Sequence, residues 1–356
     1  MNPLFTGLMN EAAHLTRSGR LSEATEAIQR ALRGGEGMRP QEPRPPDDGV
    51  IDVQTRFIDD PARGPLPAQP EGADAWSRST FTHQGRTIDY MLFVPARASE
   101  APESRRPLVV MLHGCTQGAA DFAAGTRMNA HAREHGAIVL YPEEVQRANA
   151  QKCWNWFKTQ HQQRGRGEPA LLAALTQHIT QQQHADPRRV YVAGLSAGGA
   201  MAAVLGHCYP ELYAAIGVHS GLPHCAAHDL VSALNAMRTG APPVHGNPSA
   251  VSRPTIVFHG DADATVHSSN GMAVLAGATP GEISAGRSPS GRRFTRTLFS
   301  GTAAQGDAEH WLLHGAGHAW SGGSAQGSYT QPEGIDASRE MLRFFLAHHL
   351  GDAPHH

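Results

Sequence analysis

Short, continuously apolar runs recur along the chain and alternate with stretches whose apolar residues return every three or four positions. A continuous run is typical of a parallel strand buried on both faces, and the longer spacing indicates an amphipathic helix. This alternation predicts a parallel sheet with helices on both faces. Strands are expected at residues 108–112, 137–141, 190–193, 215–219, 255–259 and 311–314, and helices at 121–135, 169–183 and 333–350.

Two further stretches flank this pattern. Residues 79–83 and 88–94 surround the turn sequence Gln84-Gly85-Arg86, and apolar residues occupy every second position from Ile88 to Val94. This pattern predicts a hairpin of edge strands. Residues 223–251 show no such order, and an insertion of that kind is usually a lid or disordered.

The run at 190–193 leads into Gly194-Leu195-Ser196-Ala197-Gly198, after which small helix-forming residues follow. A strand, then G-x-S-x-G, then a helix is the nucleophile elbow of an α/β-hydrolase. The elbow is a tight turn in which glycines avoid collision with the neighbouring backbone. The sequence therefore predicts the α/β-hydrolase fold, with Ser196 presented at the end of its strand.

The chain before this domain has a different character. Residues 1–33 read as a helical hairpin with one apolar stripe per helix, broken at Gly19, which we expect to dock on the main domain, on a partner or on a second copy. Residues 34–75 are rich in proline and charge, as in a linker. We expect the catalytic domain at 76–350 and a tail at 351–356.

Composition narrows the classes of partner and compartment. A formal net charge of −2 offers no field to collect nucleic acid or an anionic membrane, so neither is expected as a partner. No H-E-x-x-H or C-x-x-C spacing supports a metal site. The first residues lack a basic region followed by an apolar core, which favours a cytoplasmic protein over the secreted alternative.

A serine nucleophile needs a histidine base and a carboxylate that orients it, in the chain order Ser, Asp or Glu, His. The strand at 255–259 is followed by Asp261 and Asp263, and Asp263 is preferred because it lies further into the loop. The last strand is followed by a glycine-rich loop that carries His318, with His314 as the alternative. The predicted triad is Ser196, Asp263 and His318.

Acyl transfer also needs backbone N–H groups where the oxyanion forms. The N–H of Ala197, after the nucleophile, and that of Cys115, after the strand at 108–112, are the candidates. The four cysteines suggest two disulfides between neighbouring strand ends, Cys115–Cys153 and Cys208–Cys225.

Three tryptophans lie in loops expected at the catalytic face. Aromatic rings there would form an apolar wall for an acyl chain or a polymer, whereas packing in the core is the alternative for each. Trp154 and Trp320 are favoured as substrate contacts over Trp156.

At these motifs the sequence resembles the poly(3-hydroxybutyrate) depolymerase family of esterases, from about residue 81 to residue 350. The resemblance implies an α/β-hydrolase esterase with Ser196, Asp263 and His318 as its triad and without metal or organic cofactor. The residues that carry it are 112–117, Cys153-Trp154-Asn155-Trp156, Arg164-Gly165-Arg166-Gly167-Glu168-Pro169, 194–199, 259–266 and 317–323.

The resemblance implies a serine esterase for hydroxyalkanoate oligomers, stored polyester or short-chain esters. Members of the same family include feruloyl and acetylxylan esterases, so a carbohydrate esterase is the first alternative. A non-catalytic protein that binds granules or partners through residues 1–33 is the second.

Overall fold

The computed structural model describes residues 73–96, 105–242, 253–300 and 307–351. The chain divides into two units, Met1–Pro70 and Glu71–His356, and every described residue belongs to the second. The predicted helical hairpin, nearly all of the predicted linker and the residues after 351 lie outside the described residues. Their predicted organisation stays a prediction.

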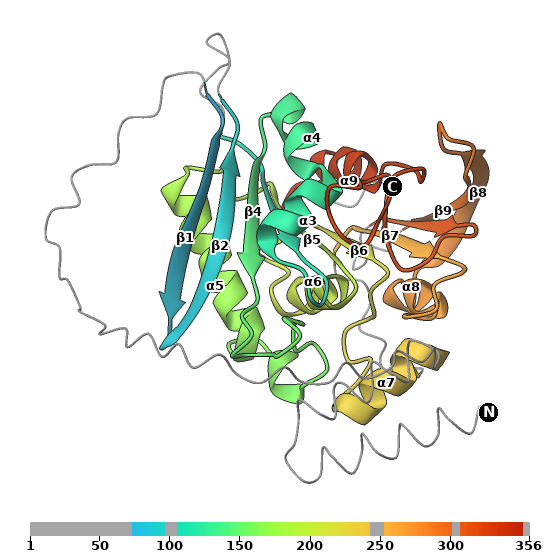
Figure 1. The fold of residues 1–356 in the computed structure, drawn as a ribbon, viewed down its shortest axis with the longest axis horizontal. Coiled ribbons are helices and arrows are strands. Elements are labelled where there is room, and N and C mark those ends of the chain that lie inside the picture. Colours follow the sequence, from blue (N-terminus) through green and yellow to red (C-terminus); the bar gives the residue numbers. More distant parts are fainter. Residues whose placement is uncertain (1–72, 97–104, 243–252, 301–306, 352–356) are drawn as a thin grey trace, which may run out of the picture. The chain divides into compact units, whose positions relative to one another are not determined.

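A single ten-stranded sheet forms the frame of the domain (Figure 1), in the order β1-β2-β4-β3-β5-β6-β7-β10-β9-β8. The six strands from β4 to β10 in this order are parallel, and the pairs at each end are antiparallel. The strands are β1 Ala75–His83, β2 Arg86–Val94, β3 Leu108–Leu112, β4 Ile138–Glu143, β5 Val190–Leu195, β6 Ala215–His219, β7 Thr255–Gly260, β8 Thr279–Arg287, β9 Arg293–Ser300 and β10 Ala308–Leu313.

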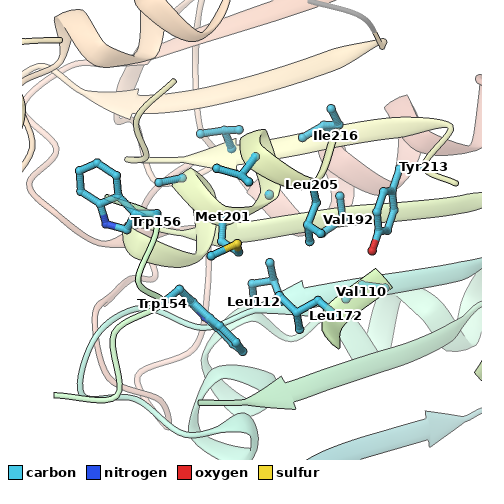
Figure 2. Close-up of a cluster of buried hydrophobic side chains, with 14 of the residues drawn as sticks. Val110, Leu112, Trp154, Trp156, Leu172, Val192, Met201, Leu205, Tyr213 and Ile216 are labelled. Carbon is cyan, nitrogen blue, oxygen red and sulfur yellow. The ribbon is translucent and has the colours of Figure 1, made fainter. Parts of the chain in front are cut away.

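Helices cover both faces of the sheet, as the apolar runs predict. Successive residues of β3 point to opposite faces, so Val110 joins one core cluster and Val109 and Met111 join the other. Helices α5 (Gly167–Gln182) and α6 (Ala197–Cys208) contribute to the first cluster. The second receives α3 (Ala119–Thr126), α4 (Met128–His135) and α9 (Ala337–Leu346). Close up, side chains of β3, β5, α5 and α6 interlock in the first cluster (Figure 2).

The structure differs from the sequence prediction at several elements. The helix expected at 121–135 is two helices, because Arg127 takes the left-handed conformation at φ 57° between α3 and α4. The insertion expected as a lid or disordered contains α7 (Leu230–Thr239), which begins with a capping box between Asp229 and Ser232. The hairpin of β8 and β9 was not predicted, and the short elements α8 (Ser269–Val274), η1 (Thr159–His161), β11 (Trp320–Ser321) and β12 (Thr330–Gln331) complete the described fold.

Among the described helices, none combines the length and the apolar character that crossing a bilayer requires.

Candidate active site

Ser196 lies in the sharp turn between β5 and α6, with φ 56° and ψ −117°. A non-glycine residue in this region is strained, and the turn is closed by two glycines. A Cβ on Gly194 would lie 2.3 Å from the Gly198 carbonyl carbon, and one on Gly198 would lie 2.0 Å from the Leu112 carbonyl oxygen. The glycines therefore allow β3, β5 and α6 to approach closely enough for the turn to form.

The loops after β7 and β10 bring a carboxylate and a histidine together. The His318 Nδ1–H donates to Asp263 Oδ2 at 2.7 Å, and Asp263 Oδ1 accepts the backbone N–H groups of Thr265 and Val266, each at 2.9 Å. Because β5, β7 and β10 are parallel, these loops and Ser196 lie at the same edge of the sheet. Within the described residues, His318 Nε2 and Ser196 Oγ have no hydrogen-bond partner.

The electrostatics of Asp263 favour its charged form. Its side chain is fully buried, and burial alone would raise the pKa. The hydrogen bond and charge of His318 and the two backbone N–H groups outweigh burial, so the pKa of Asp263 lies below its ordinary value. An ionised carboxylate at this position keeps the proton of His318 on Nδ1 and leaves Nε2 as an acceptor.

The two alternatives from the sequence, Asp261 and His314, pair with each other. Asp261 Oδ2 accepts from His314 Nδ1 at 2.8 Å, and His314 Nε2 lies 2.9 Å from the Thr295 hydroxyl. Both ring nitrogens of His314 are therefore occupied, so it has no lone pair available for a serine. The structure separates the two acid–histidine pairs and places Asp263 and His318 in the less exposed one.

The candidate oxyanion donors, the N–H groups of Cys115 and Ala197, have no acceptor among the described residues. The loop after β3 that carries Cys115, residues 113–117, is held on several sides, and we call it the oxyanion loop. The Gly114 N–H donates to Gln117 Oε1 at 2.9 Å, and Cys115 forms the predicted disulfide with Cys153, which is confirmed. A loop held in this way can keep an N–H group aimed at a fixed point.

The second predicted disulfide is wrong, because Cys208 and Cys225 are both free. Cys208 is buried, and its thiol donates to the Gln162 carbonyl oxygen at 3.5 Å. Cys225 is exposed and lies 3.4 Å from His224 Nδ1. Sequence separation and nearby strand ends could not reveal these local partners.

The predicted substrate contacts Trp154 and Trp320 are also wrong, since their side chains are 0% and 1% exposed. The Trp154 Nε1–H donates to the His113 carbonyl oxygen, and Trp320 stacks on His219 and donates to the Ser338 hydroxyl. Trp156 is buried as well, and Figure 2 shows it beside Met201 in the first core cluster. Packing in the core, the alternative for all three rings, is what the structure shows.

Three buried histidines support the site and were not predicted. His113, His219 and His259 lie at or just after the carboxyl ends of β3, β6 and β7, which are parallel strands of the sheet. His219 accepts the Ser321 N–H and its own carbonyl oxygen accepts the Ser196 N–H at 2.9 Å. A histidine repeated at strand ends was the signal in the sequence that could have identified them.

These three rings are held in the neutral form. Burial lowers the pKa of His113 to about 4 and, with the neighbouring His259 and His318, that of His219 to about 3. The His113 Nδ1–H donates to the Gly114 carbonyl oxygen while Nε2 accepts the Glu144 N–H, which fixes one tautomer. No group of three or more His, Cys, Asp or Glu side chains within the described part of the chain is arranged to hold a metal ion.

Residues 88–278, just over half of the chain, match the family model "Esterase PHB depolymerase". The chain belongs to the PHB depolymerase esterase family. The match covers the elbow, the oxyanion loop and the Asp263 loop, whereas the His318 loop lies after its end.

Relatives of this chain include proteins with different named activities. It is 35% identical to poly(3-hydroxyalkanoate) depolymerase C of Paucimonas lemoignei over 46% of this chain and 42% of that protein. It is 32% identical to feruloyl esterase B of Neurospora crassa over 40% of this chain and 46% of that protein. The chain thus spans less than half the length of these relatives.

A solved structure shows the same fold. Acetyl xylan esterase from Aspergillus awamori matches with a TM-score of 0.58 and 18% identity, over 76% of this chain and 98% of that chain. At this identity the likeness establishes the α/β-hydrolase fold alone.

Two of the motifs that carry the family resemblance have structural roles in this chain. In Cys153-Trp154-Asn155-Trp156 the first two residues hold the Cys115 loop, and Asn155 donates its backbone and side-chain N–H groups to Glu168. Glu168, from the glycine-rich motif, lies in the first turn of α5 and is buried. The two motifs are therefore joined by buried hydrogen bonds between Asn155 and Glu168.

Proposed function

We propose that this protein is a serine esterase that hydrolyses carboxylic esters through an acyl-enzyme on Ser196. The observation that carries the proposal is the strained turn at Ser196, at the same sheet edge as a His318 ring whose Nδ1–H is bound by Asp263. Strained residues persist where the surrounding structure holds them, and they concentrate at active sites. Membership of the esterase family supports the same reaction.

In the proposed mechanism Ser196 Oγ attacks the ester carbonyl carbon while its proton moves to His318 Nε2. The N–H groups of Cys115 and Ala197 stabilise the tetrahedral oxyanion, and Asp263 stabilises the imidazolium. Collapse breaks the ester bond, and His318 gives its proton to the leaving alcohol. A water molecule, deprotonated by His318, then attacks the acyl-enzyme and releases the acid and Ser196.

We propose oligomers of 3-hydroxyalkanoic acids as the substrate class, since poly(3-hydroxyalkanoate) depolymerase C is among the similar relatives. Feruloyl or acetyl esters of plant polysaccharide are the alternative, since feruloyl esterase B and acetylxylan esterase A are also relatives. Hydrolysis of a 3-hydroxybutyrate trimer compared with methyl ferulate separates the two. Faster turnover of methyl ferulate would reject the polyester assignment and keep the esterase.

The decisive test of the mechanism is hydrolysis of p-nitrophenyl acetate by the wild type and by Ser196→Ala. Loss of the nucleophile should lower kcat by a factor on the order of 10⁴ or more, with the melting temperature unchanged. Turnover by Ser196→Ala at the wild-type rate would reject Ser196 as the nucleophile. A folded wild type with no turnover on any ester would favour the non-catalytic binding protein.

The disulfide bears on the cellular compartment in which the protein works. The cytoplasmic assignment is a prediction from the first residues, whereas the Cys115–Cys153 disulfide is typical of an oxidising compartment. We therefore favour the secreted alternative, and fractionation of the native host with antibody against the protein tests it.

A further inference from the structure

The three loop tryptophans are buried and offer no ring to solvent. A different aromatic side chain is exposed beside the oxyanion loop. Tyr329 is 48% exposed. Its hydroxyl lies 3.2 Å from the hydroxyl of Thr116, the residue after the candidate oxyanion donor Cys115. The other exposed large apolar side chains of the described residues are Trp76, Val231, Met272 and Ile283.

Tyr329 belongs to a segment, residues 328–331, that joins the two halves of the site; we call it the bridging segment. On one side, Gln117 Nε2 of the oxyanion loop donates to the Ser328 carbonyl oxygen at 3.0 Å. On the other, the Tyr329 carbonyl oxygen accepts the Trp320 N–H at 2.7 Å, two residues after His318. The backbone of the bridging segment is thus tied to both the oxyanion loop and the histidine loop.

The backbone at this contact is unusual on both sides. Tyr329 has φ 51° and Thr116 has φ 67°, in the left-handed region that non-glycine residues rarely adopt. Two strained residues whose side-chain hydroxyls meet at the edge of a candidate active site indicate a constrained position with a functional use. The contact between the two hydroxyls fixes the position of an otherwise exposed ring.

We propose that Tyr329 is a specificity-determining residue whose ring forms a wall beside the oxyanion site and packs against substrates that extend beyond the scissile ester. This inference rests on the proposed esterase function. The ring offers apolar area that a chain of ester units can cover, whereas an acetyl ester is too short to use it. Because the hydroxyl is held by Thr116, little side-chain freedom is lost on binding.

The test compares a 3-hydroxybutyrate trimer with p-nitrophenyl acetate on full-length variants. Tyr329→Ala removes the ring, and Tyr329→Asn removes it with a residue that tolerates the left-handed backbone, in case alanine destabilises the segment. Tyr329→Phe is the matched control, because it removes only the hydroxyl. The first two should raise KM for the trimer about tenfold, with kcat/KM for the acetate within about twofold of the wild type.

Tyr329→Phe should keep KM for the trimer within about threefold of the wild-type value. An unchanged KM in Tyr329→Asn would overturn the inference, as would an equal loss on both substrates. A wild type that cleaves the acetate and not the trimer would overturn it as well. The esterase proposal is separate, since it fails only if acetate hydrolysis does not depend on Ser196.

Discussion

At the scale of single residues, the candidate site depends on backbone atoms that approach one another too closely for side chains. Gly198 is the extreme case among the contacts with backbone, because a Cβ at this position would collide with the Leu112 carbonyl oxygen. Gly317, next to His318, has open space around the position of a Cβ and no positive φ. The two glycines therefore differ sharply in what an added methyl group would do.

Gly198→Ala should abolish esterase activity and lower the unfolding free energy by several kcal/mol, because β3 and α6 must separate (about 3 kcal/mol or more for a buried clash). Gly317→Ala should keep both properties near the wild-type values. Urea unfolding and p-nitrophenyl acetate turnover measure the two effects. Equal behaviour of the variants would show that close packing at the elbow is not what the glycines provide.

The two acid–histidine pairs make a second residue-scale prediction. His318→Ala should lower kcat by a factor on the order of 10³ or more, since the proposed base is lost. His314→Ala removes a ring bound to Asp261 and Thr295 and should change kcat less than about threefold, as a substitution outside the catalytic machinery. Steady-state kinetics of the two variants distinguish the pairs, and a larger loss in His314→Ala would reverse the assignment.

At the scale of elements, the oxyanion loop is held by segments distant in the sequence. Cys153 is joined to Cys115 across 38 residues, and Gln117 Nε2 donates to Ser328. The loop after β3 has no regular structure of its own to fix the Cys115 N–H, so these ties must do it. Removing one should therefore weaken both stability and catalysis.

Cys153→Ser should lower the unfolding free energy by about 3 kcal/mol through the lost cross-link and should lower kcat more than it raises KM. Cys225→Ser replaces an exposed free cysteine and serves as the control, with neither value expected to change. Urea unfolding and ester hydrolysis, each with and without reductant, give the comparison. A Cys153→Ser enzyme with wild-type kcat would show that the other ties suffice.

At the scale of the whole molecule, buried histidines link stability to pH. Burial lowers the pKa of His113 and His310 to about 4 and that of His219 to about 3, from an ordinary value of 6.5. The unfolded chain binds protons at these residues from about pH 6.5 downward, whereas the folded chain does not until about pH 4. Their contribution is therefore complete above about pH 6.5 and is lost as the pH falls.

The unfolding free energy should fall by about 1.4 kcal/mol per pH unit for each histidine between about pH 6 and 4.5. Urea unfolding at several pH values in this range measures the slope. His310→Gln removes one of these titrations and should reduce the slope by about 1.4 kcal/mol per pH unit. If His310→Gln left the slope unchanged, the ring of His310 would bind protons as readily in the folded protein as in the unfolded chain.

Much of the sheet could be predicted from the sequence. The boundaries of β3 and β6 match the predicted strands, because strands buried on both faces are continuously apolar and flanked by polar loops. The β8–β9 hairpin was missed because these two strands at the end of the sheet carry few buried residues, so their sequences resemble loops. The split at Arg127 was missed because a single left-handed residue leaves helical periodicity intact on either side.

The sequence by itself determined the α/β-hydrolase fold, the elbow at Ser196 and the two loops that hold its candidate partners, because these depend on local patterns at strand ends. Only the tertiary structure decided which acid pairs with which histidine, which cysteines are joined and which aromatic ring reaches solvent. Those outcomes depend on contacts between segments as distant as Thr116 and Tyr329. A local sequence pattern shows which chemical groups a loop carries. Which of these groups contact each other depends on how the loops pack together at the edge of the sheet.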